Sequence, residues 1–225
     1  MKKVLLIAGL VTLTATAFGQ KATTDAPFSL EGLVNYNTSS LSFTSPAVRA
    51  RYFLSDNLAL RLQVGIDNST TKRTAYELPT GGQEGTYTYK SSMMNFGLGA
   101  EYHFKGTDRL SPYAGAQFNF GTGKDKLTTE NYDSSTDAFT PNYTEEGSQG
   151  TLHIGGQIVG GVDIYLVQNL YMGVELGFVF GTTSLKEGEY TVTNAGVGAT
   201  SKLAPGKDGS FVTSATAAFR FGWRF

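Results

Sequence analysis

The chain has 225 residues, of which 40% are hydrophobic and 16% are charged, and its formal net charge is −1. This length suits one domain of ordinary size, and a near-neutral chain without a basic stripe argues against a nucleic-acid-binding surface. The absence of cysteine excludes disulfides, thiolate metal sites, a cysteine nucleophile and a lipidated N-terminal cysteine.

The first twenty residues have the pattern of a secretion signal. Lys2 and Lys3 form a positive N-terminal region, an apolar run follows, and Ala17-Phe18-Gly19 is a small-x-small cleavage motif. The alternative is a transmembrane anchor, but the apolar run is shorter than the roughly twenty residues that a spanning helix needs. We therefore expect residues 1–20 to be a cleaved signal peptide and residues 21–225 to form one domain.

Eight later segments alternate between apolar and polar residues with a period of two, which is typical of strands with two different faces. At the end of the last segment, from residue 219 onward, one face carries four aromatic side chains, and the opposite face carries Arg220 and Arg224. The segments are 28–37, 46–54, 58–67, 92–104, 111–121, 151–166, 170–181 and 211–225.

The segment lengths and the connections predict a membrane barrel. Each segment is near the 9–11 residues that a tilted spanning strand requires, and only helices and closed barrels satisfy their backbone groups in lipid. Short connections at 55–57, 105–110 and 167–169 alternate with longer ones at 38–45, 68–91, 122–150 and 182–210. Short periplasmic turns and longer outer loops are the outer-membrane arrangement. The predicted fold is therefore all-β: an eight-stranded antiparallel up-and-down transmembrane β-barrel with short periplasmic turns, long extracellular loops and both termini on the periplasmic side.

The main alternative fold is a soluble barrel of the lipocalin kind, in which the apolar face points inward around a ligand. A water-facing sheet would use lysine freely, whereas the lysines after the leader lie in the expected loops, turns or N-terminal tail. The polar face consists largely of glycine and arginine, and small residues beside paired charges suit a narrow lumen. Both features favour the membrane barrel.

The polar faces carry charged residues that we expect to form a charge network in the lumen. Such charges persist in a low-dielectric interior only when they are paired and hydrogen-bonded. Where the barrel closes, Arg220 should pair with Glu31 or with Glu175. The network is either a structural plug or a selectivity constriction in a narrow pore, because eight strands leave an interior just wide enough for side chains. Its members are Glu31, Arg49, Arg51, Arg61, Glu101, Asp163, Glu175, Arg220 and Arg224.

No catalytic, cofactor or metal site is predicted. His103 and His153 fall at opposite ends of their strands, so they cannot share a site, and each is expected to be a hydrogen-bonded filler. Ile154 and Gly155 follow His153, so the His-x-Ser arrangement of the deacylase type is absent.

The expected outer loops leave two alternatives open. The acidic segment 122–150 is expected to be a solvated loop, with a surface Ca²⁺ site as the alternative. Exposed tyrosine is a favoured contact residue, so the loop tyrosines predict either a ligand-binding surface or loops that pack on one another. These tyrosines are Tyr76, Tyr87, Tyr89, Tyr132, Tyr143 and Tyr190.

The leader, the eight strands and the aromatic ending together resemble the small outer-membrane β-barrel family that contains the OmpA transmembrane domain, OmpX and OmpW. The resemblance implies localisation in the bacterial outer membrane, with outer-membrane lipids as partners. It also implies that periplasmic chaperones and the barrel assembly machinery act during biogenesis. The residues that look like the assembly signal are Phe219, Phe221, Trp223 and Phe225.

Three hypotheses for function follow. The first is a structural or surface-interaction barrel with a closed, charge-paired lumen and an extracellular ligand at its loops. The second is a narrow pore or a transporter for small solutes, hydrophobic ones included, which pass through the mouth or through a lateral gap near Gly32, Gly156 and Gly160. The third is a lipid-modifying barrel enzyme, for which the sequence offers no placed catalytic group.

Overall fold

The computed structural model describes residues 26–36, 43–78 and 82–225. The predicted signal peptide, 1–20, lies outside these residues. Within the described ranges, no helix is long and apolar enough to cross a membrane.

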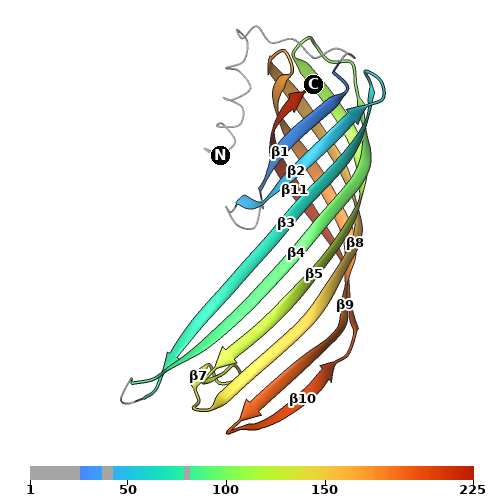
Figure 1. Cartoon of the computed structure of the whole chain (residues 1–225). Coiled ribbons are helices and arrows are strands. Elements are labelled where there is room, and N and C mark those ends of the chain that lie inside the picture. The colour runs from blue at the N-terminus through green and yellow to red at the C-terminus, as the bar shows by residue number, and fades with distance from the viewer. Residues whose placement is uncertain (1–25, 37–42, 79–81) are drawn as a thin grey trace, which may run out of the picture.

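Long antiparallel strands make up most of the described chain (Figure 1). Within these residues, eight strands close a ring in the order β1-β2-β3-β4-β5-β8-β9-β11, with β11 returning to β1. The predicted eight-stranded antiparallel fold is confirmed. The ring strands are β1 (Phe28–Tyr36), β2 (Phe43–Phe53), β3 (Leu58–Tyr76), β4 (Glu84–His103), β5 (Leu110–Glu130), β8 (Tyr143–Val167), β9 (Leu170–Asn194) and β11 (Gly206–Arg224).

The ring closes at a seam between the first and last strands. The backbone N–H of Phe28 donates to the carbonyl oxygen of Phe225 at 3.0 Å, and Phe225 donates back to Phe28 at 2.8 Å. On the outer side, Leu30 is the register partner of Trp223, and both are about half exposed. Glu31, one position along β1, is 1% exposed and points inward. The alternation therefore assigns the two faces correctly, with the apolar set outside and the polar set in the lumen.

The β2–β3, β4–β5 and β8–β9 connections are short and lie at the end of the barrel where the chain terminates (Figure 1). In the β8–β9 turn, Asn169 has a φ of 73°, a left-handed conformation that asparagine tolerates better than most residues. The predicted short turns are therefore present, and they share one end of the ring.

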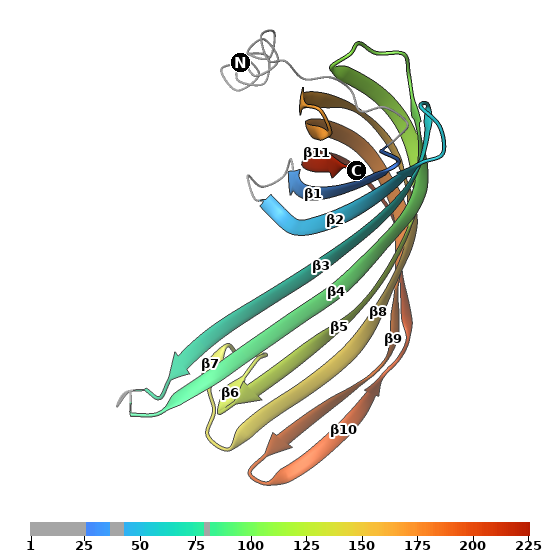
Figure 2. The same ribbon diagram turned by 45° about the horizontal axis from the view of Figure 1, so that its top comes forward.

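The three long loops predicted at 68–91, 122–150 and 182–210 are wrong, because most of these residues are strand (Figures 1 and 2). β3 continues to Tyr76 before β4 begins at Glu84, and β5 continues to Glu130. These segments are rich in threonine and tyrosine, which favour strands. Both faces of the sheet are polar here, so the apolar alternation that marks a half-buried strand is missing.

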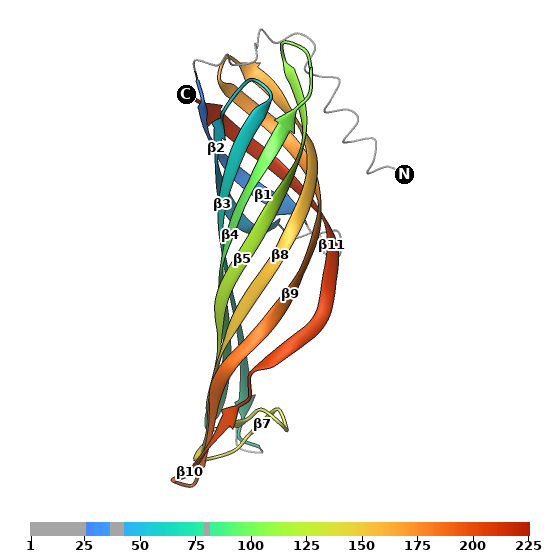
Figure 3. The same cartoon turned by 90° about the vertical axis from the view of Figure 1, so that its right-hand side faces the viewer.

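Beyond the ring, the strands form what we call the extended sheet, in the order β3-β4-β5-β8-β9-β10, where β10 is Val197–Leu203 (Figure 2). Figure 3 shows this sheet nearly edge-on. Its inner face continues the lumen surface, and its outer face continues the lipid-facing surface. The β2–β3 pairing ends at Gly65, so β3 from Ile66 to Tyr76 is an open edge as far as the described chain extends. These eleven residues correspond to a strand length of about 36 Å.

A small hairpin covers part of the inner face. It consists of β6 (Tyr132–Asp133) and β7 (Ala138–Phe139). A Cβ added at Gly85 of β4 would lie 3.3 Å from the Phe139 ring and would overlap the backbone carbonyl of Asn131. Glycine at position 85 therefore lets the hairpin pack directly on the sheet.

We predict that hydrogen exchange distinguishes the extended sheet from mobile loops. In lipid nanodiscs, the amides of 122–128 in β5 and 146–149 in β8 should exchange slowly, because these strands have partners on both sides. The amides on the open edge of β3, at 68–76, should exchange faster than those of β5 and β8. Uniformly fast exchange across all three segments would contradict a folded sheet.

Candidate functional site

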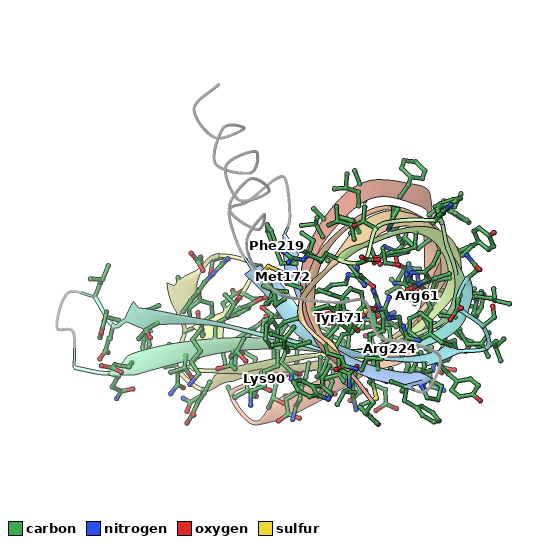
Figure 4. All side chains as sticks on the ribbon, turned by 90° about the horizontal axis from the view of Figure 1, so that it is seen from above. Arg61, Lys90, Tyr171, Met172, Phe219 and Arg224 are labelled. Carbon is green, nitrogen blue, oxygen red and sulfur yellow. The ribbon has the colours of Figure 1, made fainter. Side chains whose placement is uncertain are left out.

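The charged residues expected in the lumen converge in the half of the ring near the short turns. They come from strands all around the ring, and none of the nine is more than 3% exposed. Viewed along the barrel, Arg61 and Arg224 lie inside the ring beside Tyr171 (Figure 4). Because β-strand side chains alternate between faces, each of these residues points inward from a strand whose neighbouring residues face lipid.

Arg51 contacts more carboxylates than any other member of the network. Its Nη2 lies 2.7 Å from Oε1 of Glu31 and 2.9 Å from Oδ2 of Asp163, and its Nη1 lies 2.9 Å from Oε2 of Glu101. In the ring order, β2 and β8 are four strands apart in either direction. The Arg51–Asp163 ion pair therefore spans the full width of the lumen.

A second ion pair also spans the lumen. Nη1 of Arg61 on β3 lies 3.1 Å from Oε2 of Glu175 on β9, which is the strand opposite β3 in the ring. Arg49 reaches the same carboxylate at 2.9 Å, and Arg61 also contacts Oε1 of Glu101 at 3.0 Å. The two diametric pairs share carboxylates with their neighbours, so the charges form one connected cluster.

The structure brings Arg220 and Glu31 together at the seam, with 3.2 Å between Nη1 and Oε1. The second carboxylate on Arg220 is Asp163, through Nη2. Glu175, the alternative partner considered from the sequence, is instead bound by guanidinium groups from β2 and β3. Strand order alone does not show that side chains reach across the lumen.

Arg224 lies near the end of the barrel, at the last position of β11. Its Nε–H donates to the backbone carbonyl of Ala26, and its guanidinium carbon lies 3.8 Å from the centre of the Phe53 ring. A cation over an aromatic face is an attractive arrangement. Arg224 thus ties the last strand to the segment that precedes β1 and to the end of β2.

The sequence did not identify three polar partners of the network. The hydroxyl of Tyr113 donates to Oε2 of Glu175 at 2.6 Å, and that of Tyr171 donates to Oε1 of Glu31 at 2.7 Å. Gln63 accepts a hydrogen bond from Nη2 of Arg49 at 2.8 Å. These hydrogen bonds satisfy carboxylate lone pairs and a guanidinium N–H in addition to the ion pairs. Buried charges need such additional hydrogen bonds.

The inward-facing glycines are a sequence feature from which the positions of the two tyrosine rings could have been predicted. A Cβ at Gly222 would overlap the ring of Tyr171, and one at Gly161 would overlap the ring of Tyr113. Each glycine gives a large ring room against the barrel wall. An inward glycine opposite an inward tyrosine therefore indicates a ring that lies along the wall and fills the lumen.

The two histidines lie apart, as expected. Nδ1 of His103 is 2.9 Å from Oγ of Ser111, and its Nε2 is 3.4 Å from Oε2 of Glu101. Nδ1 of His153 is 3.2 Å from Oγ1 of Thr183. Both rings are therefore held by neighbouring lumen groups.

Of the lipid-facing glycines, Gly156 is covered by a neighbouring aromatic ring. The ring of Phe180 covers Gly156 so closely that an added Cβ would lie 2.7 Å from its Cζ. A shallow hollow of about 490 Å³ lies there on the outer wall, bordered by Phe118, Ile154 and Ile158. This hollow is lined mainly by apolar groups.

Several of the tyrosines expected in loops pack on the extended sheet or bond to its own residues. The Tyr132 ring is 1% exposed and lies 5.7 Å from the Tyr87 ring, and Arg73 lies 5.3 Å from the centre of that second ring. The Tyr143 hydroxyl donates to Glu145, and burial raises the pKa of Tyr143 to about 12. These contacts favour intramolecular packing for these rings.

Asp137, in the acidic segment 122–150, is also engaged locally. The Tyr132 hydroxyl donates to Asp137 and holds the pKa of that carboxyl below its usual value, and Arg73 adds an exposed ion pair at 3.3 Å. Within the described ranges, no group of three or more His, Asp or Glu side chains is placed to hold a metal ion.

Comparison with known proteins identifies the family. Residues 35–180 match the model of the "Putative OmpA-OmpF-like porin family". The chain belongs to this porin family. It is an outer-membrane β-barrel protein of OmpA-like, porin-like type. A search of curated proteins found no match.

Several solved structures are similar to this porin-family barrel. The N-terminal β-barrel domain of Pseudomonas aeruginosa OprF is 16% identical with a TM-score of 0.33, covering 88% of this chain and 96% of that one. A major outer membrane protein from Thermus thermophilus is 19% identical with a TM-score of 0.49, covering 89% and 99%. Ail from Yersinia pestis is 13% identical with a TM-score of 0.36, covering 88% and 96%.

We predict that Glu31→Gln strongly destabilises the porin-family barrel. The substitution puts a neutral amide in place of a buried carboxylate that contacts Arg49, Arg51 and Arg220. Breaking a buried ion pair typically costs about 3–5 kcal/mol. Urea unfolding in lipid vesicles should show a clearly lower midpoint. The matched control is Glu187→Gln, which removes an exposed contact with Lys202 and should leave the midpoint unchanged. Equal effects of the two substitutions would show that the lumen pairing does not determine stability.

We also predict that Gly222→Ala destabilises the barrel, because the new methyl group overlaps the buried Tyr171 ring. Overpacking of this kind typically costs about 1–3 kcal/mol. Gly32→Ala on the neighbouring strand is the control, since no heavy atom lies within 4 Å of its added Cβ. The resistance of the folded band to heating on a gel should fall for the first variant alone. A normal heating profile for Gly222→Ala would contradict close ring packing.

Proposed function

We propose that this porin-family protein is a structural and surface-interaction barrel whose lumen is closed to steady ion flow. The single observation that carries the proposal is the pair of ion bridges across the full width of the ring. Arg51–Asp163 joins β2 to β8, and Arg61–Glu175 joins β3 to β9. An eight-stranded barrel has an interior just wide enough for side chains, so two crossing bridges with their neighbours obstruct it.

The aromatic side chains beside the bridges support the same proposal. Tyr113, Tyr165 and Tyr171 are each at most 3% exposed, and all three point into the charged half of the lumen. Rings of Tyr165 and Tyr171 lie 5.4 Å apart near the short turns. Water and ions would have to displace both hydrogen-bonded rings and paired guanidinium groups to pass.

The surface-interaction part of the proposal rests on the extended sheet. It presents two strands, β3 from Ile66 onward and β10, that each pair on one side within the described residues. An open strand edge can take an extended peptide as an added strand through main-chain hydrogen bonds. We propose that an extracellular ligand of this chain binds at the extended sheet, which lies at the end opposite the short turns.

The proposal includes the route to the membrane. Residues 1–20 would be cleaved on export, and periplasmic chaperones and the barrel assembly machinery would deliver the chain. In support, the four aromatic residues of the expected assembly signal lie on the outward face of the last strand, each 44–59% exposed. These are Phe219, Phe221, Trp223 and Phe225.

Neither alternative function has comparable support. A lateral path for hydrophobic solutes would need a gap in the wall, and Phe180 covers the position at Gly156. A hydrolytic role would need a base beside a nucleophile at an accessible site. His103 is 1% exposed and adjoins the buried Ser111 inside the charged half of the lumen, remote from the lipid surface.

Planar-bilayer recordings test the closed lumen. We predict no steady channel for the wild-type protein and salt-dependent channels for Arg51→Ala with Asp163→Ala, which removes one crossing bridge without a net charge change. The control is Arg73→Ala with Asp137→Ala, an exposed pair outside the ring, which should stay silent. Steady wild-type channels whose conductance scales with salt would overturn the closed-lumen proposal and favour the narrow pore.

A further inference from the structure

The outer face of the extended sheet changes from apolar to polar and charged side chains just beyond the apolar wall of the barrel. On β3 and β4, the last outward apolar residues are Ile66 and Met94, which are register partners and are 49% and 40% exposed. Further out, the same face carries threonine, serine and lysine. Three of these lysines lie together on two adjacent strands, and we call them the lysine patch: Lys90, Lys124 and Lys126.

The register places two like charges directly opposite each other. Lys90 of β4 is the partner of Lys126 of β5, and Lys124 is the preceding outward residue on β5. All three side chains are exposed. Directly opposed residues have Cβ atoms about 5 Å apart, and like charges there are unfavourable for the sheet. Such an arrangement is stabilised when an anion lies between the ammonium groups.

Among the described residues, none forms an ion pair with the lysine patch. The ion pairs found on the extended sheet are Arg73–Asp137 and Lys202–Glu187, and the three ammonium groups take part in neither. The outward carboxylates Glu146 of β8 and Glu189 of β9 have ladder partners other than these lysines. Glu187 lines the same hollow as Lys124, but its carboxylate pairs with Lys202. Lys186 of β9 adds a further cation, since its stem lies over Gly150, the partner of Lys124.

The position of the patch points to the membrane surface. Lys124 lies one outward position beyond the level of Met94, and Lys90 and Lys126 lie two beyond it. Each such step is about 6.6 Å along a strand, and the strands are tilted, so the ammonium groups lie at the depth of lipid head groups. In Figure 4, Lys90 lies outside the ring, beside the extended sheet. Nearer the tip, the outward face carries Glu84 and Glu130 instead.

Hydroxyl groups surround the ammonium groups. Ser92 is the partner of Lys124, Ser148 is the partner of Lys126, and Thr128 is the next outward residue on β5. Ammonium and hydroxyl groups together donate to the several oxygens of a phosphate group. A row of lysines beside an apolar membrane-facing surface is also the pattern by which proteins hold anionic lipids.

We propose that the lysine patch binds the phosphate groups of lipid head groups in the outer leaflet. The bound phosphates neutralise Lys90 and Lys126 and hold the extended sheet at a fixed depth above the membrane. The patch lies on the face opposite the lumen surface, so the proposal does not depend on whether the lumen conducts ions.

The test uses the full-length mature protein, labelled with ¹⁵N, in a nonionic detergent. It is titrated with short-chain phosphatidate, with short-chain phosphatidylcholine and with inorganic phosphate, following the amide signals of Ser92 and Thr128. We expect saturable shifts with phosphatidate. Lys90→Gln with Lys126→Gln should weaken that binding about tenfold or more, as expected for two lysines near an anionic surface.

The matched control is Lys105→Gln with Lys202→Gln, which removes the same charge from the β4–β5 turn and from the Glu187 contact. It should bind phosphatidate as the wild type does. Because every substituted side chain lies on the surface, the variants should fold, which heat-modified gel mobility verifies. Equal affinity for inorganic phosphate and phosphatidate would overturn the lipid proposal in favour of a soluble anion. Equal loss in the control variant, or no saturable shift, would overturn the patch itself.

Discussion

The structure depends on one constraint: guanidinium and carboxylate groups in a narrow lumen must pair with each other. A buried ion pair adds little stability by itself, but removing one partner leaves an uncompensated charge. A one-residue slip of a strand that carries one of these charges would send the charge into lipid and the apolar residues into the lumen. The pairing of Arg51 with Asp163 and of Arg61 with Glu175 therefore fixes strand register as well as filling the lumen.

The extended sheet follows a different rule, since water replaces lipid on its outer side. It has no apolar core, and its strands persist through ladder hydrogen bonds, the β-preference of threonine and tyrosine, and the β6–β7 hairpin packed on one face. The two faces still differ in charge. Lysines dominate the outer face near the membrane, whereas Tyr87, Tyr132 and Glu145 lie on the inner face with the hairpin.

The sequence was sufficient for the eight-stranded fold and the orientation of the faces, because lipid and lumen impose strict alternation on strands such as 58–67. It failed for 68–91, 122–150 and 182–210, where both faces are polar and the alternation has no physical cause. Inward charges could also be identified from alternation, yet their partners could not. The Glu175 contacts depend on which strands face each other across the closed ring and on how far their side chains reach across the lumen. No sequence pattern encodes these two quantities.

The seam has a kinetic consequence. Glu31 and Arg220 are 189 residues apart in the sequence, and the Tyr171–Glu31 hydrogen bond spans 140 residues. Contacts between residues so far apart in the sequence form late, because the entropy cost of closing the intervening chain must be overcome first. The charged cluster can therefore be complete only after the final residues have been delivered, and until then β1 presents an unpaired edge. The β1–β11 seam therefore closes in the same last step of folding in which the buried charges become paired.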